Sequence, residues 1–151
     1  MSSNLILGSG SQSHRRSYYL CHMMKLILIA LGGALGTLAR YGVSHVAYEK
    51  YSGLFPIGTL TVNLTGSFII GLLWGIANGL SIHPNLLAFL FVGLLGGFTT
   101  FSSYSLETLN LLRDGDYKLA LYSVLLNNVA GILLAFLGLM LAKQALQYYG
   151  K

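Results

Sequence analysis

Charged residues are scarce in this chain, and their scarcity limits the class of protein that it can be. Asp, Glu, Lys and Arg together make up 9% of the 151 residues, whereas a soluble domain carries about 25%. Hydrophobic residues make up 54%, and the mean hydropathy is +0.67. The composition therefore excludes an ordinary soluble domain and indicates a membrane protein.

Cysteine and the common catalytic motifs are also missing. Cys21 is the single cysteine, so no intrachain disulfide can form. The chain contains no His-Glu-x-x-His motif, no phosphate-binding loop and no Ser-His-Asp set within reach of a membrane; its closely spaced carboxylates, Asp114 and Asp116, lie in a polar turn. We therefore expect a protein that is not an enzyme.

Long apolar runs are what the sequence has in abundance. Four can be drawn, over residues 26–46, 57–77, 86–112 and 119–142. Each is long enough to cross a hydrocarbon core of about 30 Å as a helix. Short connections rich in Gly, Pro, Asn and Asp separate them. The pattern predicts one all-α membrane domain of four transmembrane helices over residues 24–151.

The first 23 residues differ from the rest. They are rich in Ser, include Arg15 and Arg16, and show no helical apolar period. A signal peptide is disfavoured because no small-residue cleavage site follows the apolar run that begins at Leu26. Met23 and Met24 stand just before that run. We expect residues 1–23 to be an N-terminal extension, either a disordered tail or an artefact of an upstream start site.

A polar segment, residues 96–105 (GGFTTFSSYS), interrupts the third apolar run near its middle. Adjacent glycines loosen the backbone, and hydroxyl groups offer other partners to carbonyls that a helix would leave unpaired. Non-helical backbone at that depth is tolerated only where it is buried in protein or lines a wet cavity. We therefore expect the third helix to be broken mid-membrane and to border an ion or substrate path.

Positive charge is almost equally shared between the two sides of the predicted bundle. One side has Lys25, Lys143 and Lys151; the other has Lys50, Arg113 and Lys118, with Arg40 toward that side. Because positive residues normally mark the cytoplasmic side, this balance favours insertion in both orientations and pairing of two opposite copies. A single orientation, set by another bias such as the basic residues of the extension, stays open.

Small residues at four-residue spacing occur in every span, and such rows allow close helix packing. The rows are Gly32 and Gly36; Ser67, Gly71 and Gly75; Gly93 and Gly97; Gly131 and Ala135.

Several polar side chains lie within the spans. Asn63 is near the centre of the second, with Thr59 one turn before it, and Ser123 and Asn127 are similarly spaced in the fourth. Such an amide either forms an interhelical hydrogen bond or donates to an anion in a pore, and the residue type does not choose between these roles.

Two charges lie near span ends, Arg40 and Glu107. Either can reach the membrane interface. Arg40 would also concentrate anions at a pore mouth, whereas Glu107 opposes that effect unless it is paired.

Three segments carry a family resemblance: residues 32–41 (GGALGTLARY), 58–68 (GTLTVNLTGSF) and 96–102 (GGFTTFS). Together, on the first, second and third spans, they resemble the CrcB or Fluc family of fluoride channels. The resemblance implies a dual-topology antiparallel homodimer in the plasma or inner membrane, with two fluoride-selective pores and a structural sodium ion at the dimer centre. It implies passive export of fluoride from the cytoplasm, which relieves toxicity, and no nucleic-acid partner.

The resemblance also implies roles for particular residues. The carbonyls of Gly96 and Thr99 would hold the sodium ion, Asn63 would donate to fluoride, and Phe101 would be the first of two aromatic rings in the pore. The other residues assigned to the fluoride path are Arg40, Thr59, Tyr104, Ser123 and Asn127. Tyr104 stands where the family usually has a second Phe, and its phenol either binds fluoride or narrows the path.

A small proton-coupled multidrug-type transporter is the alternative, since it also has four short helices and dual topology. Such a pump needs a membrane-embedded carboxylate in its first span, and residues 26–46 contain none. A structural subunit that only packs against partners is a third possibility, which the hydroxyl cluster near mid-membrane disfavours.

Overall fold

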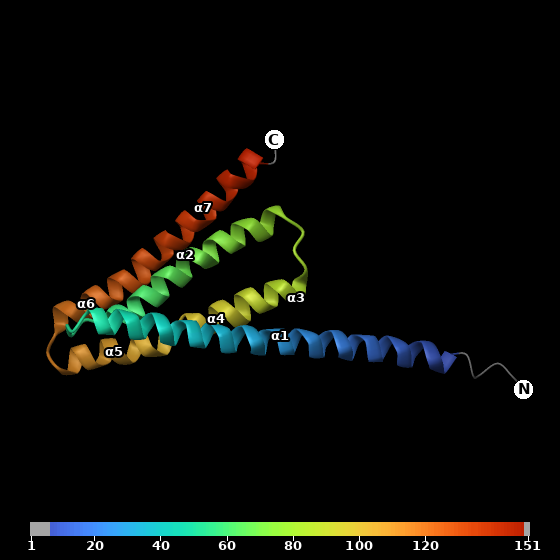
Figure 1. Ribbon diagram of the computed structural model, residues 1–151, viewed down its shortest axis with the longest axis horizontal. Coiled ribbons are helices and arrows are strands. Elements are labelled where there is room, and N and C mark those ends of the chain that lie inside the picture. Colours follow the sequence, from blue (N-terminus) through green and yellow to red (C-terminus); the bar gives the residue numbers. More distant parts are fainter. Residues whose placement is uncertain (1–6, 150–151) are drawn as a thin grey trace, which may run out of the picture.

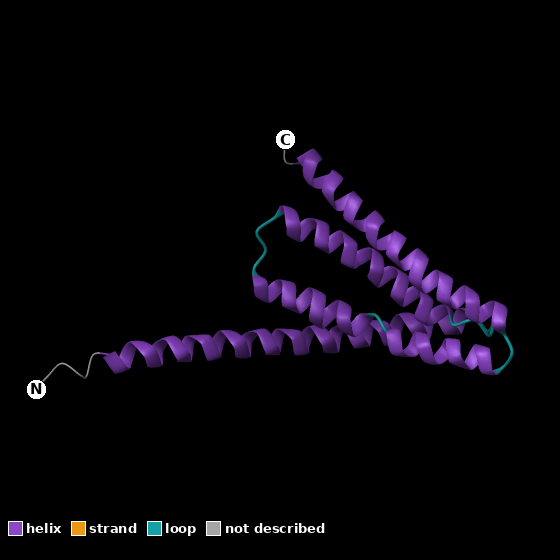
Figure 2. Cartoon of the chain, turned by 180° about the vertical axis from the view of Figure 1, so that it is seen from behind, coloured by secondary structure: helices purple, strands orange, loops and turns teal. Residues whose placement is uncertain are grey.

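The computed structural model describes the backbone of residues 7–149 and the side chains of residues 19, 20 and 22–148. Throughout this part of the chain, the regular structure is helical (Figures 1 and 2). In chain order the elements are α1 (Leu7–Lys50), α2 (Ile57–Gly79), α3 (Pro84–Leu87), the π-helical η1 (Ala88–Leu95), α4 (Gly96–Phe98), α5 (Phe101–Arg113), α6 (Tyr117–Leu125), the π-helical η2 (Leu126–Ala130) and α7 (Gly131–Tyr149).

Within the described residues, four helical stretches are long and apolar enough to cross a membrane. They are His22–Lys50, Ile57–Gly79, Pro84–Arg113 and Tyr117–Tyr148. These coincide with the four apolar runs of the sequence, so the prediction of an all-α membrane protein with four spans is confirmed. The third span joins α3, η1, α4 and α5, and the fourth joins α6, η2 and α7.

The structure describes part of the predicted N-terminal extension. Residues 7–23 are helical and continue α1 without interruption into the first span. No Gly or Pro follows Gly10 until Gly32, so nothing in the sequence stops a helix from propagating backward from the first span. Figure 1 shows this end of α1 projecting beyond the other helices. Residues 1–6 lie outside the described part, and the domain boundary at residue 24 stays a prediction.

The spans pack in two close pairs, α1 with η1 and α4, and α2 with α7. A Cβ atom added at Gly97 would lie 2.6 Å from the carbonyl oxygen of Gly33, and one at Gly93 would lie 2.7 Å from that of Ile29. In the second pair, a Cβ at Gly71 would strike the carbonyl of Ala135. The helices therefore meet backbone to backbone, as the rows of small residues predicted.

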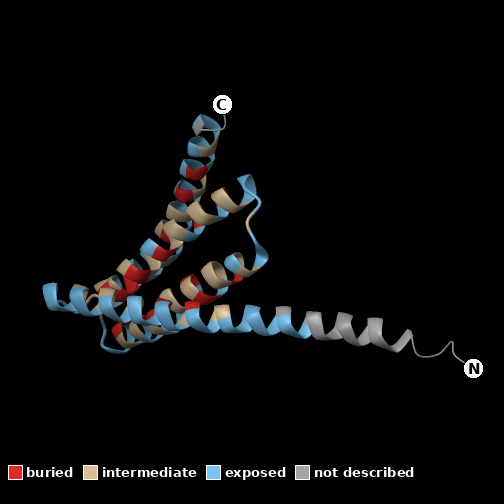
Figure 3. Ribbon diagram, turned by 45° about the vertical axis from the view of Figure 1, so that its right-hand side comes forward, coloured by how far each residue is buried: buried red, intermediate tan, exposed pale blue. Residues whose placement is uncertain are grey.

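Burial is confined to the inner faces of the bundle (Figure 3). The buried apolar side chains, among them Leu60, Val62, Leu95 and Leu111, form a thin core. Large apolar side chains cover the outside; Leu38, Leu109 and Ile132 are examples. A contiguous apolar exterior of this kind suits lipid tails or a second membrane chain.

The third span changes conformation at Thr99 and Thr100, inside the polar segment singled out in the sequence. Helix α4 ends at Phe98 and α5 begins at Phe101. Thr99 has φ −79° and ψ 157°, and Thr100 has φ −147° and ψ 116°, so both are extended. Thr100 then caps α5, because its Oγ1 accepts a hydrogen bond from the Ser103 amide at 3.2 Å.

Candidate functional site

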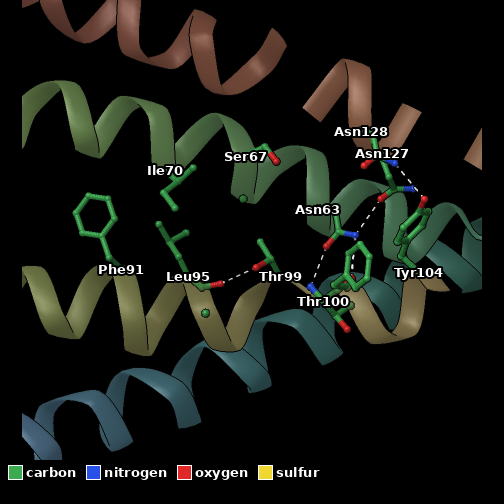
Figure 4. Close-up of a pocket in the computed structure, with 13 residues that line it drawn as sticks. Asn63, Ser67, Ile70, Phe91, Leu95, Thr99, Thr100, Tyr104, Asn127 and Asn128 are labelled. Carbon is green, nitrogen blue, oxygen red and sulfur yellow. Dashed lines mark hydrogen bonds between the residues drawn. The ribbon is translucent and has the colours of Figure 1, made fainter. Parts of the chain in front are cut away.

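A cavity of about 320 Å³ lies beside the extended residues. It is an open cavity lined by α2, the third span and η2, and Figure 4 shows its polar side chains converging near Thr100. The lining residues are Asn63, Gly66, Ser67, Ile70, Phe91, Leu95, Gly96, Thr99, Thr100, Phe101, Tyr104, Asn127 and Asn128. The lining thus mixes amides, hydroxyls and aromatic rings, and these thirteen residues include no charged side chain.

Asn63 ties α2 to the extended backbone. Its Oδ1 accepts from the Thr100 amide at 2.9 Å, and its Nδ2 donates to the Thr100 carbonyl at 3.0 Å and to Asn127 Oδ1 at 2.9 Å. In an uninterrupted helix the Thr100 amide would bond to the Gly96 carbonyl, so Asn63 replaces the partner that the amide lost. The interhelical role that the sequence allowed for Asn63 is therefore present. Its role as a donor to fluoride stays a prediction.

The same interruption leaves the carbonyl of Gly96 without its helical donor, because the Thr100 amide is held by Asn63. The Thr99 carbonyl accepts a long hydrogen bond, 3.5 Å, from Arg40 Nη1. Carbonyl oxygens are suitable ligands for a hard cation. Because a carbonyl has two lone pairs, Thr99 can serve both Arg40 and an ion, so the donor set predicted from Gly96 and Thr99 fits sodium.

The two aromatic residues contact each other edge to face. The ring centroids of Phe101 and Tyr104 are 5.4 Å apart, with the planes inclined at 62°. Tyr104 is buried, with 9% of its surface exposed, whereas Phe101 is 76% exposed. The Tyr104 hydroxyl accepts a hydrogen bond from Asn128 Nδ2 at 3.0 Å. Tyr104 therefore belongs to the cavity wall, while Phe101 presents most of its ring to the outside of the single chain.

Three predicted path residues, Arg40, Thr59 and Ser123, are not among those that line the cavity. Ser123 is completely buried and shares a hydrogen bond with the Thr108 hydroxyl at 2.9 Å. Thr59 Oγ1 donates to Glu107 Oε1 at 2.8 Å, and the Tyr48 hydroxyl donates to the same oxygen at 3.1 Å. The structure thus brings Asn63, Asn127 and both aromatic rings together at the cavity. Among the lining residues, the hydrogen-bond partner of Arg40 is the Thr99 carbonyl, and Thr59 and Ser123 are set apart.

Glu107 is held by hydroxyl groups. Among the described residues its recorded partners are Tyr48 and Thr59, and its Oε2 is buried without a hydrogen-bond partner. Glu107 would leave a positive vestibule unopposed only if it were paired with a cation. Within the described part of the chain it has no such partner.

Asn128 is the main cavity residue that the sequence analysis did not select. In a regular α-helix, adjacent residues point about 100° apart, so a pore position for Asn127 does not by itself predict that Asn128 faces the same cavity. The π-helical stretch η2 contains both residues, and both line the cavity. π-Helical turns occur frequently at functional sites. The Asn-Asn pair in an apolar span was the available signal.

Comparisons with known proteins agree on one family. The model of the family described as "CrcB-like protein, Camphor Resistance (CrcB)" matches residues 27–139. A protein of Parabacteroides distasonis named "Fluoride-specific ion channel FluC" is 48% identical over 121 residues, which cover 80% of this chain and 94% of that protein. Proteins with the same name from Salinibacter ruber and Aquifex aeolicus are 48% and 45% identical over 116 residues, covering 77% and 76% of this chain and 87% and 94% of theirs.

Proposed function

The chain belongs to the CrcB-like protein family, and on that basis we propose that it is a fluoride-selective ion channel, not an enzyme, through which fluoride leaves the cytoplasm passively. The relatives named as fluoride-specific channels cover most of its length. The structural observation that carries the proposal is the cavity beside Thr99 and Thr100, which is lined by hydrogen-bond donors and ring edges.

Fluoride is a small anion that gives up its hydration shell only where other donors replace the water. The amides of Asn63 and Asn127 and the hydroxyl of Tyr104 are such donors. The edges of aromatic rings carry partial positive charge, and Phe101 and Tyr104 present rings at the same place. Because the lining residues include no Asp or Glu, no fixed negative charge there opposes the anion. Asn63 uses both amide protons in the structure described, so donation to fluoride requires one of these bonds to be exchanged for the anion.

The transporter alternative lacks the feature it needs. Glu49 is the carboxylate of α1 in the described part of the chain. It lies in the last turn of that helix and is exposed. Glu107 on α5 is not among the residues that line the cavity. Passive conduction needs no coupling carboxylate, so the channel accounts better for these positions than a proton-coupled pump.

The channel is further proposed to be an antiparallel homodimer of dual topology in the plasma or inner membrane, with the third helix broken at mid-membrane. The balanced positive charge supports mixed orientation. The exposed ring of Phe101 and the apolar exterior support a second chain as neighbour. At the dimer centre, the carbonyls of Gly96 and Thr99 would hold a sodium ion, which would supply a fixed positive charge. Arg40 would orient the Thr99 carbonyl.

Fluoride efflux from liposomes that contain this chain alone tests the proposal. An ion-selective electrode should record fluoride release that requires only the fluoride gradient, with chloride retained. Release that depends on a proton gradient, or chloride release at a comparable rate, would contradict the channel.

A further inference from the structure

The hydroxyl of Tyr104 has a proton that no other described residue accepts. Its oxygen accepts from Asn128 Nδ2 at 3.0 Å, and the described residues provide no acceptor for its own O–H. We propose that this hydroxyl, oriented by Asn128, is a direct donor to the permeating anion and raises the affinity of this channel for fluoride. The inference rests on the proposed channel function and assigns a specificity-determining contact within it.

The position of the hydroxyl supports this role. Tyr104 is 9% exposed and lines the cavity, and a donor that is removed from water without an acceptor is destabilising. A phenolic O–H prefers to lie in the plane of its ring. With Asn128 donating to one side of the oxygen (Figure 4), the proton is left to point elsewhere. The acceptor that the O–H requires is thus to be found in the cavity, as water or as an anion.

Two of the three neighbouring amides, those of Asn63 and Asn128, already use both protons. The third, Asn127 Nδ2, donates one of its two, to the Ser123 carbonyl. Asn63 Nδ2 donates to the Thr100 carbonyl and to Asn127 Oδ1. Asn128 Nδ2 donates to Tyr104 and to the Val124 carbonyl. An anion in the cavity would displace an existing bond to reach either amide, whereas the Tyr104 proton is available without such an exchange.

Asn128 acts on the anion through Tyr104. A hydrogen bond received by a hydroxyl oxygen polarises the O–H and strengthens its donation. The other Asn128 bond, to the Val124 carbonyl at 2.8 Å, fixes the amide on its own helix. Asn128 is therefore a positioning residue, and Tyr104 is the residue that contacts the anion. A short, strong O–H donor favours fluoride over the larger chloride ion, whose charge is more diffuse.

The test measures fluoride flux from liposomes at graded fluoride concentrations. Tyr104→Phe keeps the ring and removes the hydroxyl, so we expect the half-saturating fluoride concentration to rise about tenfold, the change that corresponds to one hydrogen bond to a charged group. The ratio of fluoride to chloride flux should fall in the same variant. Tyr122→Phe, which removes an exposed hydroxyl outside the cavity lining, is the matched control and should leave both quantities unchanged.

Asn128→Ala provides a second and independent variant. It should raise the half-saturating concentration by a smaller factor than Tyr104→Phe, and should add nothing in a chain that already has Tyr104→Phe, because both changes remove the same contact. If Asn128→Ala raises the half-saturating fluoride concentration by the same factor in the unaltered chain and in the Tyr104→Phe chain, the role of Asn128 is purely structural and its positioning role is overturned.

The outcomes distinguish a failure of the proposed channel function from a failure of the donor role of Tyr104. If the unaltered chain releases no fluoride, the proposed channel function is wrong. If the unaltered chain conducts fluoride, but Tyr104→Phe has the same half-saturating concentration and the same selectivity, the donor role of Tyr104 is overturned and the channel function stands. If Tyr104→Phe does not yield folded protein, Asn128→Ala alone decides, since an unchanged half-saturating concentration there also overturns the inference.

Discussion

Replacing Asn63 by Asp should suppress fluoride flux, because it puts a negative charge beside the cavity. The new carboxylate keeps the oxygen that accepts from the Thr100 amide at 2.9 Å. It loses the two N–H donors that now reach the Thr100 carbonyl and Asn127 Oδ1. Rotation of the Asn127 amide by a half-turn would present its NH₂ group to the carboxylate, but would break the bond that Nδ2 donates to the Ser123 carbonyl at 3.0 Å. The change therefore adds a negative charge and also weakens local hydrogen bonds, so assembly is checked before flux is measured.

The size of the effect follows from the distance at which an anion would pass. A fluoride ion at 4 Å from the carboxylate meets a repulsion of about 4 kcal/mol at an effective dielectric constant of about 20. Such a rise in the barrier corresponds to a fall in rate of about a thousandfold. Wild-type Asn63 adds no net charge to the cavity lining, so this repulsion is new.

The assay is fluoride efflux from liposomes, recorded with an ion-selective electrode after gel filtration has shown that the variant assembles like the unaltered chain. Asn78→Asp is the matched control, because it makes the same chemical change near the exposed end of the same helix, α2. It should conduct normally. Near wild-type flux in correctly assembled Asn63→Asp would remove Asn63 from the fluoride path and leave it as the group that holds Thr100.

Three further predictions follow from the same geometry. Phe101→Ile should suppress flux strongly, because it removes a ring edge while keeping an apolar side chain; normal efflux from an intact assembly would exclude a pore role. Ser52 and Ser81 lie in the exposed connections at opposite ends of α2 and are replaced singly by Cys in a chain without the native cysteine. The proposed dual topology predicts that an impermeant thiol reagent labels each to about half; full labelling of one and full protection of the other would show a single orientation. Gly36→Ala should destabilise the bundle by about 1–3 kcal/mol, because the new Cβ would strike the Leu94 carbonyl. At Gly42 a new Cβ meets nothing within 4 Å, so Gly42→Ala should stabilise α1 by about 0.5–1 kcal/mol. Stability is measured as the loss of the gel-filtration peak after heating, and an equal loss in both variants would contradict the backbone contact at Gly36.

The four spans could be predicted because each depends on a local property, a run of apolar residues long enough to cross a bilayer. The close packing was predictable for a similar reason, since small residues repeat every four positions within one helix. The unusual segment after Gly96 was also evident, because hydroxyl-rich sequence is rare inside an apolar run. The contacts of its residues were not evident.

Local sequence signals did not predict the length of α1 or which residues of the fourth span face the cavity. The composition of residues 1–23 did not predict the helix over residues 7–23, because helix propagation depends on the absence of breakers and on a helix already formed next to it. The residue types at 127 and 128 do not say that both amides face one cavity; the placement of η2 beside α2 does so. The burial of Ser123 against Thr108 likewise follows from the packing of α6 on α5.

By itself, the sequence determined the membrane class, the four helices and the chemical types near the centre of the bundle, because hydropathy and residue spacing act along the chain. The tertiary structure alone decided how those groups are used. Asn63 meets Thr100 and Asn127, which are 37 and 64 residues away, and these distant contacts consume its donors. The Tyr104 hydroxyl accepts from Asn128, 24 residues away, and no described residue accepts its proton. These pairings depend on position in space and not on order in the chain.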